Sequence, residues 1–377
     1  MTVLDKVHDI VNSPHQFAQD WKAKTGGKVA GYLCTNLPEE PLYAAGVLPV
    51  RILGSNEPET EAATHLFSGS FCCFARDIIA QGIRGKYNYL DGLIHAVCCL
   101  HTRIVFDTWR RNLPIYYNYV LNLPIYLLNP HAKKYIIGEL EDYVRSIEEW
   151  LGRSISLEKL DEAINVYNTN RRLMTSIYEL MKADDPPVTE AEVAELALAG
   201  LLIDKGTHNR LLEEALEELP KRKNVGNDGP RLMLLGSENN NIEFLRFIDS
   251  LGGRVVIDDY CTGSRYYDAE VIPEENRLGA LASRIINRAP CPLKDLPVRR
   301  RPAHIAKLAD DYRVQGVIFA PNIKCDPHGL DSPIIEKTLK AKGIPMLRLE
   351  MDLGIPLGQF RTRIEAFLEI LASSEVR

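Results

Sequence analysis

Residues 29–53 read VAGYLCTNLPEEPLYAAGVLPVRIL. An apolar run at 29–34 ends at Cys34, and the proline and acidic residues that follow suit the first turn of a helix. A second apolar run then begins at Val50. This succession predicts two parallel strands joined by a helix, the unit from which α/β proteins are built.

The same alternation continues on both sides of this stretch. The pattern predicts one amphipathic helix at 3–25, helices at 71–79 and 101–109, and strands at 93–97 and 115–120. From 131 to about 222 the pattern is helical throughout, with Thr189 and Glu192 spaced as a capping box. Residues 221–230 are charged and rich in Gly and Asn, which is typical of a linker.

A second alternation of strands and helices follows the linker. We expect strands at 232–235, 255–257, 317–320 and 346–349, and helices at 242–251, 333–342 and 359–372. The predicted fold class is therefore α/β, with two Rossmann-like parallel-sheet domains joined by a helical segment. The expected boundaries are 1–130 for the N-terminal α/β domain, 131–228 for the helical segment and linker, and 229–377 for the C-terminal α/β domain.

Composition excludes several classes of protein. The net charge is −6, and the sequence has no basic stripe with interleaved aromatic residues, which argues against nucleic acid as the main partner. No run approaches 18 consecutive apolar residues, and the beginning MTVLDKVHDIV has no signal-peptide pattern, so we expect a cytoplasmic protein without membrane spans. In a reducing compartment, eight cysteines are not expected to form a disulfide framework.

Six separated cysteines are the strongest functional signal. Four of them follow predicted strands, and ligands of parallel sheets bind beyond the carboxyl ends of the strands. Thiolates that converge from loops of two domains can hold an iron–sulfur cluster in the cleft between them, although buried free thiols, one or two of them reactive, are the alternative. The six candidate ligands are Cys34, Cys72, Cys99, Cys261, Cys291 and Cys325.

Two of these candidates belong to doublets, Cys72-Cys73 and Cys98-Cys99. Adjacent residues of a helix point about 100° apart, so one member of each doublet is expected to face a shared cluster. We take Cys72 and Cys99 as ligands and Cys73 and Cys98 as packing residues, with the choice within each doublet open.

Other motifs carry less information. The sequence has no CxxC pair, and it lacks both GxGxxG and GxxxxGK[ST], so we expect neither a zinc ribbon nor ATP or NAD bound by this chain. Asp258 and Asp259 end a predicted strand and are expected to cap a helix. The basic run 299–301 lies at a predicted helix start and is expected to be solvated. No catalytic residue is assigned.

The motifs around the cysteines resemble those of a known family. Cys34-Thr35-Asn36-Leu37-Pro38-Glu39-Glu40, followed by Ala44-Ala45-Gly46 and Pro49, is similar to the opening motif of the family that contains the 2-hydroxyacyl-CoA dehydratases, the ATP-dependent benzoyl-CoA reductases and the double-cubane cluster proteins. Cys72 with Phe74 resembles its Cys-Pro-Phe element, with Cys73 in place of proline. Cys99 with Arg103 resembles its Cys-Asp-x-x-Arg element, with Leu100 in place of aspartate.

The resemblance continues in the second half of the chain. Residues 258–266, DDYCTGSRY, resemble the motif of the reductase branch, and Cys291-Pro292 and Cys325-Asp326-Pro327 fall where further family cysteines lie. The family's C-terminal signature is matched by Gln359, Thr362, Arg363, Glu365, Ala366 and Phe367.

This resemblance implies an iron–sulfur cluster between two α/β domains. The cluster would be [4Fe-4S] if three cysteines bind it, or a double-cubane [8Fe-9S] cluster if all six do. The closest expected function is the smaller catalytic-core subunit of a benzoyl-CoA reductase, which reduces the aromatic ring of an aryl-CoA. The alternatives are a 2-hydroxyacyl-CoA dehydratase subunit, which eliminates water through a ketyl radical, and a double-cubane protein that reduces small molecules.

The resemblance also implies partners. It predicts a sister catalytic-core subunit, an acyl-CoA substrate, and ATP-hydrolysing electron-activating subunits that carry their own [4Fe-4S] cluster, with ferredoxin as the upstream donor.

Overall fold

The first half of the chain forms a four-stranded parallel sheet. The computed structural model describes residues 1–57, 61–223, 225–294, 296–354 and 356–374. The strands are ordered β2-β1-β3-β4, and every neighbouring pair is parallel. Their bounds are β1 Val29–Tyr32, β2 Leu48–Arg51, β3 Gly92–Ala96 and β4 Tyr117–Leu121.

A second parallel sheet repeats this order in the second half of the chain. Its strands are ordered β6-β5-β7-β8, so both sheets have the order 2-1-3-4 of their own strands. The order reverses between β1 and β3 and again between β5 and β7, and such points are where α/β sheets bind ligands. The bounds are β5 Arg231–Leu235, β6 Arg254–Asp259, β7 Gly316–Phe319 and β8 Met346–Arg348. The predicted α/β class with two Rossmann-like sheets is thus confirmed.

Helices cover both faces of the first sheet. The prediction of one helix at 3–25 is wrong, because the structure has two helices there, separated at Ser13-Pro14. Proline disfavours helical backbone at the residue before it, which accounts for the break. The helices of this half are α1 Val3–Asn12, α2 Gln16–Thr25, α3 Glu40–Ala44, the 3-10 helix η1 Glu61–Ala63, α4 Cys73–Ile83, α5 Leu100–Asn112 and α6 Ala132–Leu151.

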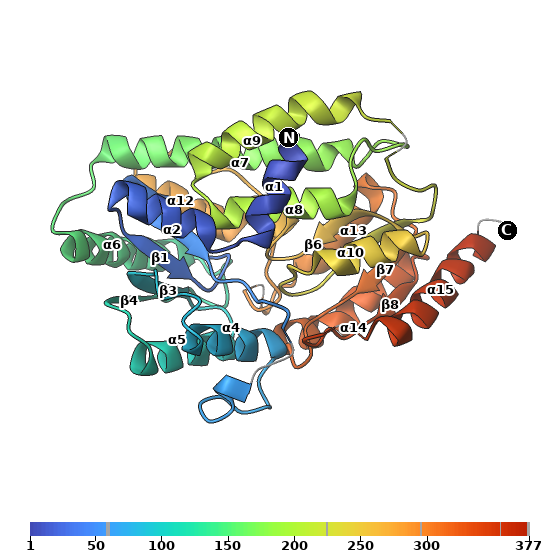
Figure 1. Cartoon of the computed structure of the whole chain (residues 1–377), viewed down its shortest axis with the longest axis horizontal. Coiled ribbons are helices and arrows are strands. Elements are labelled where there is room, and N and C mark those ends of the chain that lie inside the picture. Colours follow the sequence, from blue (N-terminus) through green and yellow to red (C-terminus); the bar gives the residue numbers. More distant parts are fainter. Residues whose placement is uncertain (58–60, 224, 295, 355, 375–377) are drawn as a thin grey trace.

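Three helices form the middle segment and lie along both sheets (Figure 1). Helix α7, with 24 residues, contacts α3 of the first half and α11 of the second, and at 1.5 Å per residue it spans about 36 Å. The capping box of Thr189 and Glu192 at the start of α8 is confirmed. The segment contains α7 Leu157–Leu180, α8 Glu190–Leu202, α9 Lys205–Glu218 and the 3-10 helix η2 Leu219–Lys221.

The second sheet is also covered on both faces. The helix expected at 333–342 begins earlier, at Asp326. Proline is tolerated in the first turn of a helix, where Pro327 lies, and Pro333 lies inside the helix. Among the described residues, no helix is both long and apolar enough to cross a membrane. The helices are α10 Ile242–Ser250, α11 Ser264–Tyr267, α12 Arg277–Asn287, α13 Arg301–Asp311, α14 Asp326–Ala341 and α15 Leu357–Ser374.

Two helices pack across the expected domain boundaries. Leu281 and Ile285 of α12 enter the core formed by the first sheet and α6. Val3 and Val7 of α1 enter the core of the second half, against α8. The two halves therefore share parts of their hydrophobic cores. The domain boundaries expected after residues 130 and 228 stay a prediction.

A buried ion pair ties the first half to the middle segment. Arg171 of α7 donates from Nη2 to Oε1 of Glu40 in α3 at 2.5 Å, and both side chains are less than one-tenth exposed. Burial by itself raises the pKa of Glu40, but Arg171 and Arg284 outweigh this effect and hold that pKa below its usual value. Glu40 is therefore ionised, and removal of its charge leaves Arg171 buried without compensation.

Glu40→Gln is expected to lower the free energy of unfolding by about 3–5 kcal/mol, the cost of leaving a buried charge without its partner. The control is Glu270→Gln, which removes the partner of the adjacent Arg172. That pair also lies at 2.5 Å, but its side chains are 55% and 35% exposed, so its loss is expected to cost about 0–1 kcal/mol. Urea unfolding of the variants measures both changes, and equal losses would contradict the assignment of a structural role to Glu40.

Candidate metal centre

Seven of the eight cysteines line one cavity of about 100 Å³ between the two sheets. Two larger hollows, of about 370 and 660 Å³, contain no cysteine among their lining residues. The cavity includes all six candidate ligands and adds Cys98. Its cysteines are Cys34, Cys72, Cys98, Cys99, Cys261, Cys291 and Cys325.

The first sheet contributes three of these thiols from its switch point. Cys34 follows β1, and Cys98 and Cys99 follow the adjacent strand β3. Interaction with the Cys98 thiol, together with burial, raises the pKa of Cys34 well above its usual value. Both Cys98 Sγ and Cys99 Sγ lie 3.3 Å from Oγ1 of Thr102. Two strand ends and one helix turn therefore bring three thiols together.

Three cysteines occupy helix N-caps, where the positive end of the helix dipole favours a thiolate. Cys72 precedes α4, Cys99 precedes α5, and Cys325 precedes α14. Cys99 also accepts a hydrogen bond from the Thr102 amide at 3.5 Å. The N-terminal ends of three helices thus meet at the rim of the cavity.

The second sheet contributes from its loops. Cys261 follows β6, and its amide donates to the carbonyl of Ser237 after β5 at 3.1 Å. Cys325 reaches the cavity from the loop after β7, and Cys291 comes from the segment after α12. Burial raises the pKa of Cys261 to about 12 and that of Cys325 to about 11. A metal that binds these thiols would have to displace their protons.

The two doublets differ. Cys73 does not line the cavity, and its thiol donates instead to the carbonyl of Met351 at 3.4 Å. Cys98 and Cys99 both line the cavity, which differs from the expectation that Cys98 only packs. The expectation assumed a helix, whereas Cys98 lies in extended chain between β3 and the N-cap of α5. Which cysteines bind metal stays a prediction.

Buried cations surround the thiols. Arg51, Arg265 and Arg288 line the cavity, and Lys294 lies beside it with Nζ donating to the carbonyl of Leu123 at 2.6 Å. Burial lowers the pKa of Lys294, and the neighbouring Cys98, Cys291 and Cys34 oppose that effect. Within the described residues, Nε and Nη1 of Arg51 and Nε of Arg288 have no hydrogen-bond partner.

Thiols, buried cations and unpartnered N–H donors together fit an anionic cluster whose sulfides accept hydrogen bonds. A single metal ion fits less well. In the described part of the chain, no three Cys, His, Asp or Glu side chains gather closely enough to bind one ion. Ligands of a cluster bind different irons and stand further apart, so the cysteine cavity suits a multi-iron group better than zinc.

Charged residues around the cavity were missed or misinterpreted in the sequence analysis. Arg301 is 1% exposed and donates to Asp259 at 2.7 Å and to Asp331 at 2.6 Å, so the expectation that residues 299–301 are solvated is wrong for Arg301. Burial opposes ionisation of Asp259, but Arg265 and Arg301 hold its pKa below its usual range. Arg51, the last residue of β2, and Glu238, three residues after β5, were also missed, although a charged residue at or just after a strand end was the available signal.

Known proteins similar to this chain share most of its length. A family model described as "2-hydroxyglutaryl-CoA dehydratase, D-component" matches residues 34–371. The (R)-phenyllactyl-CoA dehydratase beta subunit of Clostridium sporogenes is 25% identical over 365 residues, 96% of this chain and 97% of the relative. A benzoyl-CoA reductase subunit of Thauera aromatica is 27% identical over 338 residues, 88% of this chain and 87% of the relative.

A third relative has the same extent. The (R)-2-hydroxyglutaryl-CoA dehydratase beta subunit of Acidaminococcus fermentans is 26% identical over 380 residues, 98% of this chain and 99% of the relative. The family match begins at Cys34 and covers the remaining seven cysteines. The chain therefore belongs to the 2-hydroxyglutaryl-CoA dehydratase D-component family, the family of 2-hydroxyacyl-CoA dehydratase and benzoyl-CoA reductase subunits.

Proposed function

We propose that this chain is the iron–sulfur subunit of an ATP-dependent reductase of the benzoyl-CoA reductase type. The observation that carries the proposal is the cavity between the two sheets, lined by seven cysteines from both halves of the chain. The relative from Thauera aromatica, named as a benzoyl-CoA reductase subunit, supports the reaction type. The proposed substrate is an aromatic acyl-CoA, whose ring would be reduced to a cyclic diene.

In this proposal, six thiolates hold the cluster in two sets. The first contains Cys34, Cys291 and either Cys98 or its neighbour Cys99; the charges of Cys34, Cys98 and Cys291 act on Lys294. The second contains Cys72, Cys261 and Cys325, since Cys325 acts on the pKa of Cys72 and Cys261 acts on that of Cys325. The two sets adjoin, because Cys34 also acts on the pKa of Cys261. Two sets of three suit a double-cubane [8Fe-9S] cluster better than one [4Fe-4S] cluster.

The cluster would supply single low-potential electrons. The residues of this chain would set the charge and the access of water around the cluster. Arg51, Arg288 and Lys294 balance the negative charge of the thiolates, while Leu33, Phe74, Pro292 and Leu293 form apolar wall that limits water. Buried cations stabilise the reduced, more negative form of a cluster. Apolar walls have the contrary effect, because they favour the less charged form.

The proposal includes partners. We infer a sister catalytic-core subunit, because the relatives are named as subunits. We further propose ATP-hydrolysing electron-activating subunits with their own [4Fe-4S] cluster and ferredoxin as the upstream donor. This chain would accept electrons from them.

A dehydratase is the second candidate. Three relatives are named as dehydratase beta subunits, with 24–26% identity. In this case the same thiolates would hold the cluster, and the substrate would be a 2-hydroxyacyl-CoA that loses water. The two candidates share the metal centre and differ in the acyl-CoA that they consume.

The ligand set is tested by single Cys→Ser variants, purified without oxygen. Cys34→Ser, Cys261→Ser and Cys291→Ser are each expected to lower iron and acid-labile sulfide per chain, because each removes a thiolate from the cluster. Cys73→Ser is the matched control, since Cys73 is a buried cysteine that points to Met351 rather than the cavity, and it should retain the wild-type content. Full iron in all three cavity variants would refute the six-thiolate site.

Iron content of the wild-type protein, co-expressed with its partners, measures the cluster type. About eight irons per chain are expected for the double-cubane cluster, whereas about four would indicate a [4Fe-4S] cluster and leave three of the thiols without iron. A folded protein that contains no iron would refute the proposed function.

The substrate is tested with the complete complex, ATP and a low-potential reductant. Benzoyl-CoA is expected to be consumed with formation of the cyclic diene, and a 2-hydroxyacyl-CoA is expected to be left unchanged. Product analysis by mass spectrometry separates the two. Loss of water from the 2-hydroxyacyl-CoA, with benzoyl-CoA untouched, would replace the reductase by the dehydratase.

A further inference from the structure

Glu238 is a buried carboxylate in the wall of the cysteine cavity. It lies three residues after the end of β5, and it is 8% exposed. Its Oε2 lies 3.4 Å from Nη2 of Arg51. No described residue is a hydrogen-bond partner of its Oε1. A buried carboxylate oxygen without a partner is costly, which points to a group that it meets only when the protein works.

A small cavity that is mostly polar adjoins the cysteine cavity at Glu238, which lines both. It has a volume of about 20 Å³, and Cys73, Phe74 and Met351 form part of its wall. Its polar lining consists of Glu238, Asp77, Asp352, Asn56, Asn239, Asn240, Asn241 and Asn322. A polar cavity of this size holds about one water molecule. The amide groups can hydrogen-bond to that water, and the water can carry a proton.

This small cavity adjoins a much larger polar cleft. The cleft has a volume of about 660 Å³ and shares Gly54, Asn56, Asn240 and Asn241 with the small cavity. At the junction, Nδ2 of Asn56 donates to Oδ1 of Asn240 at 3.2 Å, and Nδ2 of Asn240 donates to the carbonyl of Gly54 at 2.5 Å. The cleft and the small cavity therefore share a polar wall, and the small cavity reaches Glu238.

We propose that Glu238 carries protons from the polar cleft to the cysteine cavity. This inference rests on the proposed reductase function, in which ring reduction to the diene consumes two electrons and two protons. Each proton leaves water in the cleft, crosses the asparagine-lined cavity and binds Oε1 of Glu238. It then passes to the reduced ring, whose electrons come from the ATP-dependent partner, and Glu238 returns to the carboxylate.

The surroundings of Glu238 suit this exchange. Burial raises its pKa to about 7, Arg51 opposes that rise, and Asp77 of α4 adds to it. Its charge also raises the pKa of the thiols of Cys72 and Cys261, which line the same cavity. A carboxyl group that holds and releases its proton near neutral pH is an efficient general acid.

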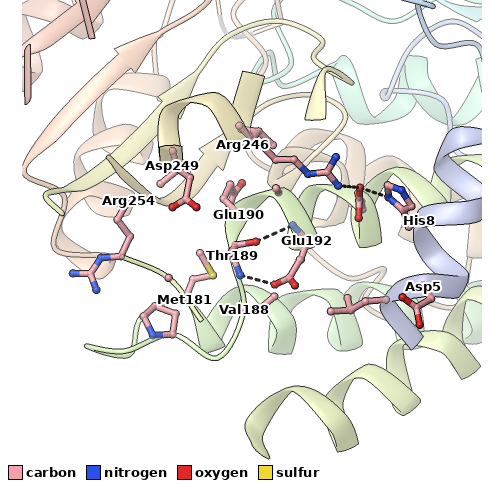
Figure 2. A pocket seen from close by; sticks show the side chains of 17 residues that line it. Asp5, His8, Met181, Val188, Thr189, Glu190, Glu192, Arg246, Asp249 and Arg254 are labelled. Carbon is pink, nitrogen blue, oxygen red and sulfur yellow. Dashed lines mark hydrogen bonds and ion pairs between the residues drawn. The ribbon is translucent and has the colours of Figure 1, made fainter. Parts of the chain in front are cut away.

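A second buried carboxylate provides the competing route. Oε2 of Glu190 also has no partner among the described residues, and Glu190 lines a cleft of about 370 Å³ near Thr189, Glu192 and Arg246 (Figure 2). Glu190 also lines a small cavity that shares Asn239 and Asn241 with the one beside Glu238, but it does not line the cysteine cavity. That cleft also includes Arg254 and Val255 at the start of β6, the end opposite to Cys261. Glu190→Gln is therefore the matched control for Glu238→Gln.

The first test uses the metal-free protein and infrared spectroscopy. Protonated Glu238 gives a carboxylic-acid carbonyl band, identified by its absence in Glu238→Gln, that fades as the pH rises through about 7. On transfer to heavy water the band should shift rapidly in the wild type. It should shift more slowly in Asn240→Leu, where an apolar side chain interrupts the polar junction. Absence of this band, or an equal exchange rate in both proteins, would overturn the route.

The second test uses the iron-loaded protein. The midpoint potential of the cluster is expected to fall with pH near neutrality by up to about 59 mV per unit, the value for one proton per electron. Glu238→Gln should abolish that slope, and Glu190→Gln should keep it. A slope that persists in Glu238→Gln with full iron, or that disappears only in Glu190→Gln, would overturn the inference. Absence of iron would instead refute the proposed function, while the infrared test still decides the route.

Discussion

Arg288 joins the two halves of the molecule at the cysteine cavity. Its guanidinium donates to the carbonyl of Thr35, next to Cys34, and to the carbonyl of Arg265 in the second half. Glu39 adds a second connection, since the Tyr266 hydroxyl donates to its Oε1 at 2.7 Å. The two cysteine-bearing loops are thereby held against each other. The arrangement of thiols around one cavity depends on these buried contacts.

The same contacts explain the charge around the cavity. A buried guanidinium is costly without compensation, and a group of thiolates close together is costly without cations. Arg51, Arg288 and Lys294 next to the thiols reduce both costs when an anionic group is present. Because the pKa values of the Cys34, Cys261 and Cys325 thiols are raised in the metal-free state, occupation by metal changes the charge of the cavity.

Electron and proton supply can be separate in this architecture. The thiols at the strand ends of both sheets enclose the space proposed for the cluster, whereas Glu238 lines both that space and the small cavity that adjoins the polar cleft. Apolar residues such as Leu33 and Phe74 form part of the cavity wall. A wall that limits water protects a strong reductant, and it makes a defined polar route necessary for protons.

The amino-acid sequence determined the strand pattern and the positions of the thiols. All eight strands are found within a few residues of their predicted places, because short apolar runs between turn residues are local features. The six candidate cysteines could be chosen because they follow strands or begin helices. The helix predictions failed at two prolines: Pro14 follows the break between two helices that were expected to be one, and Pro333 lies inside a helix that was expected to begin there.

Only the tertiary structure decided which groups meet. Cys98 lines the cavity from the extended chain after β3, whereas Cys73, the first residue of α4, donates its thiol to the carbonyl of Met351. Burial of Arg301 with Asp259, and of Glu238 with Arg51, joins residues 42 and 187 positions apart. Such pairs leave no periodic trace in the sequence, since their charges depend on partners that only folding brings within contact.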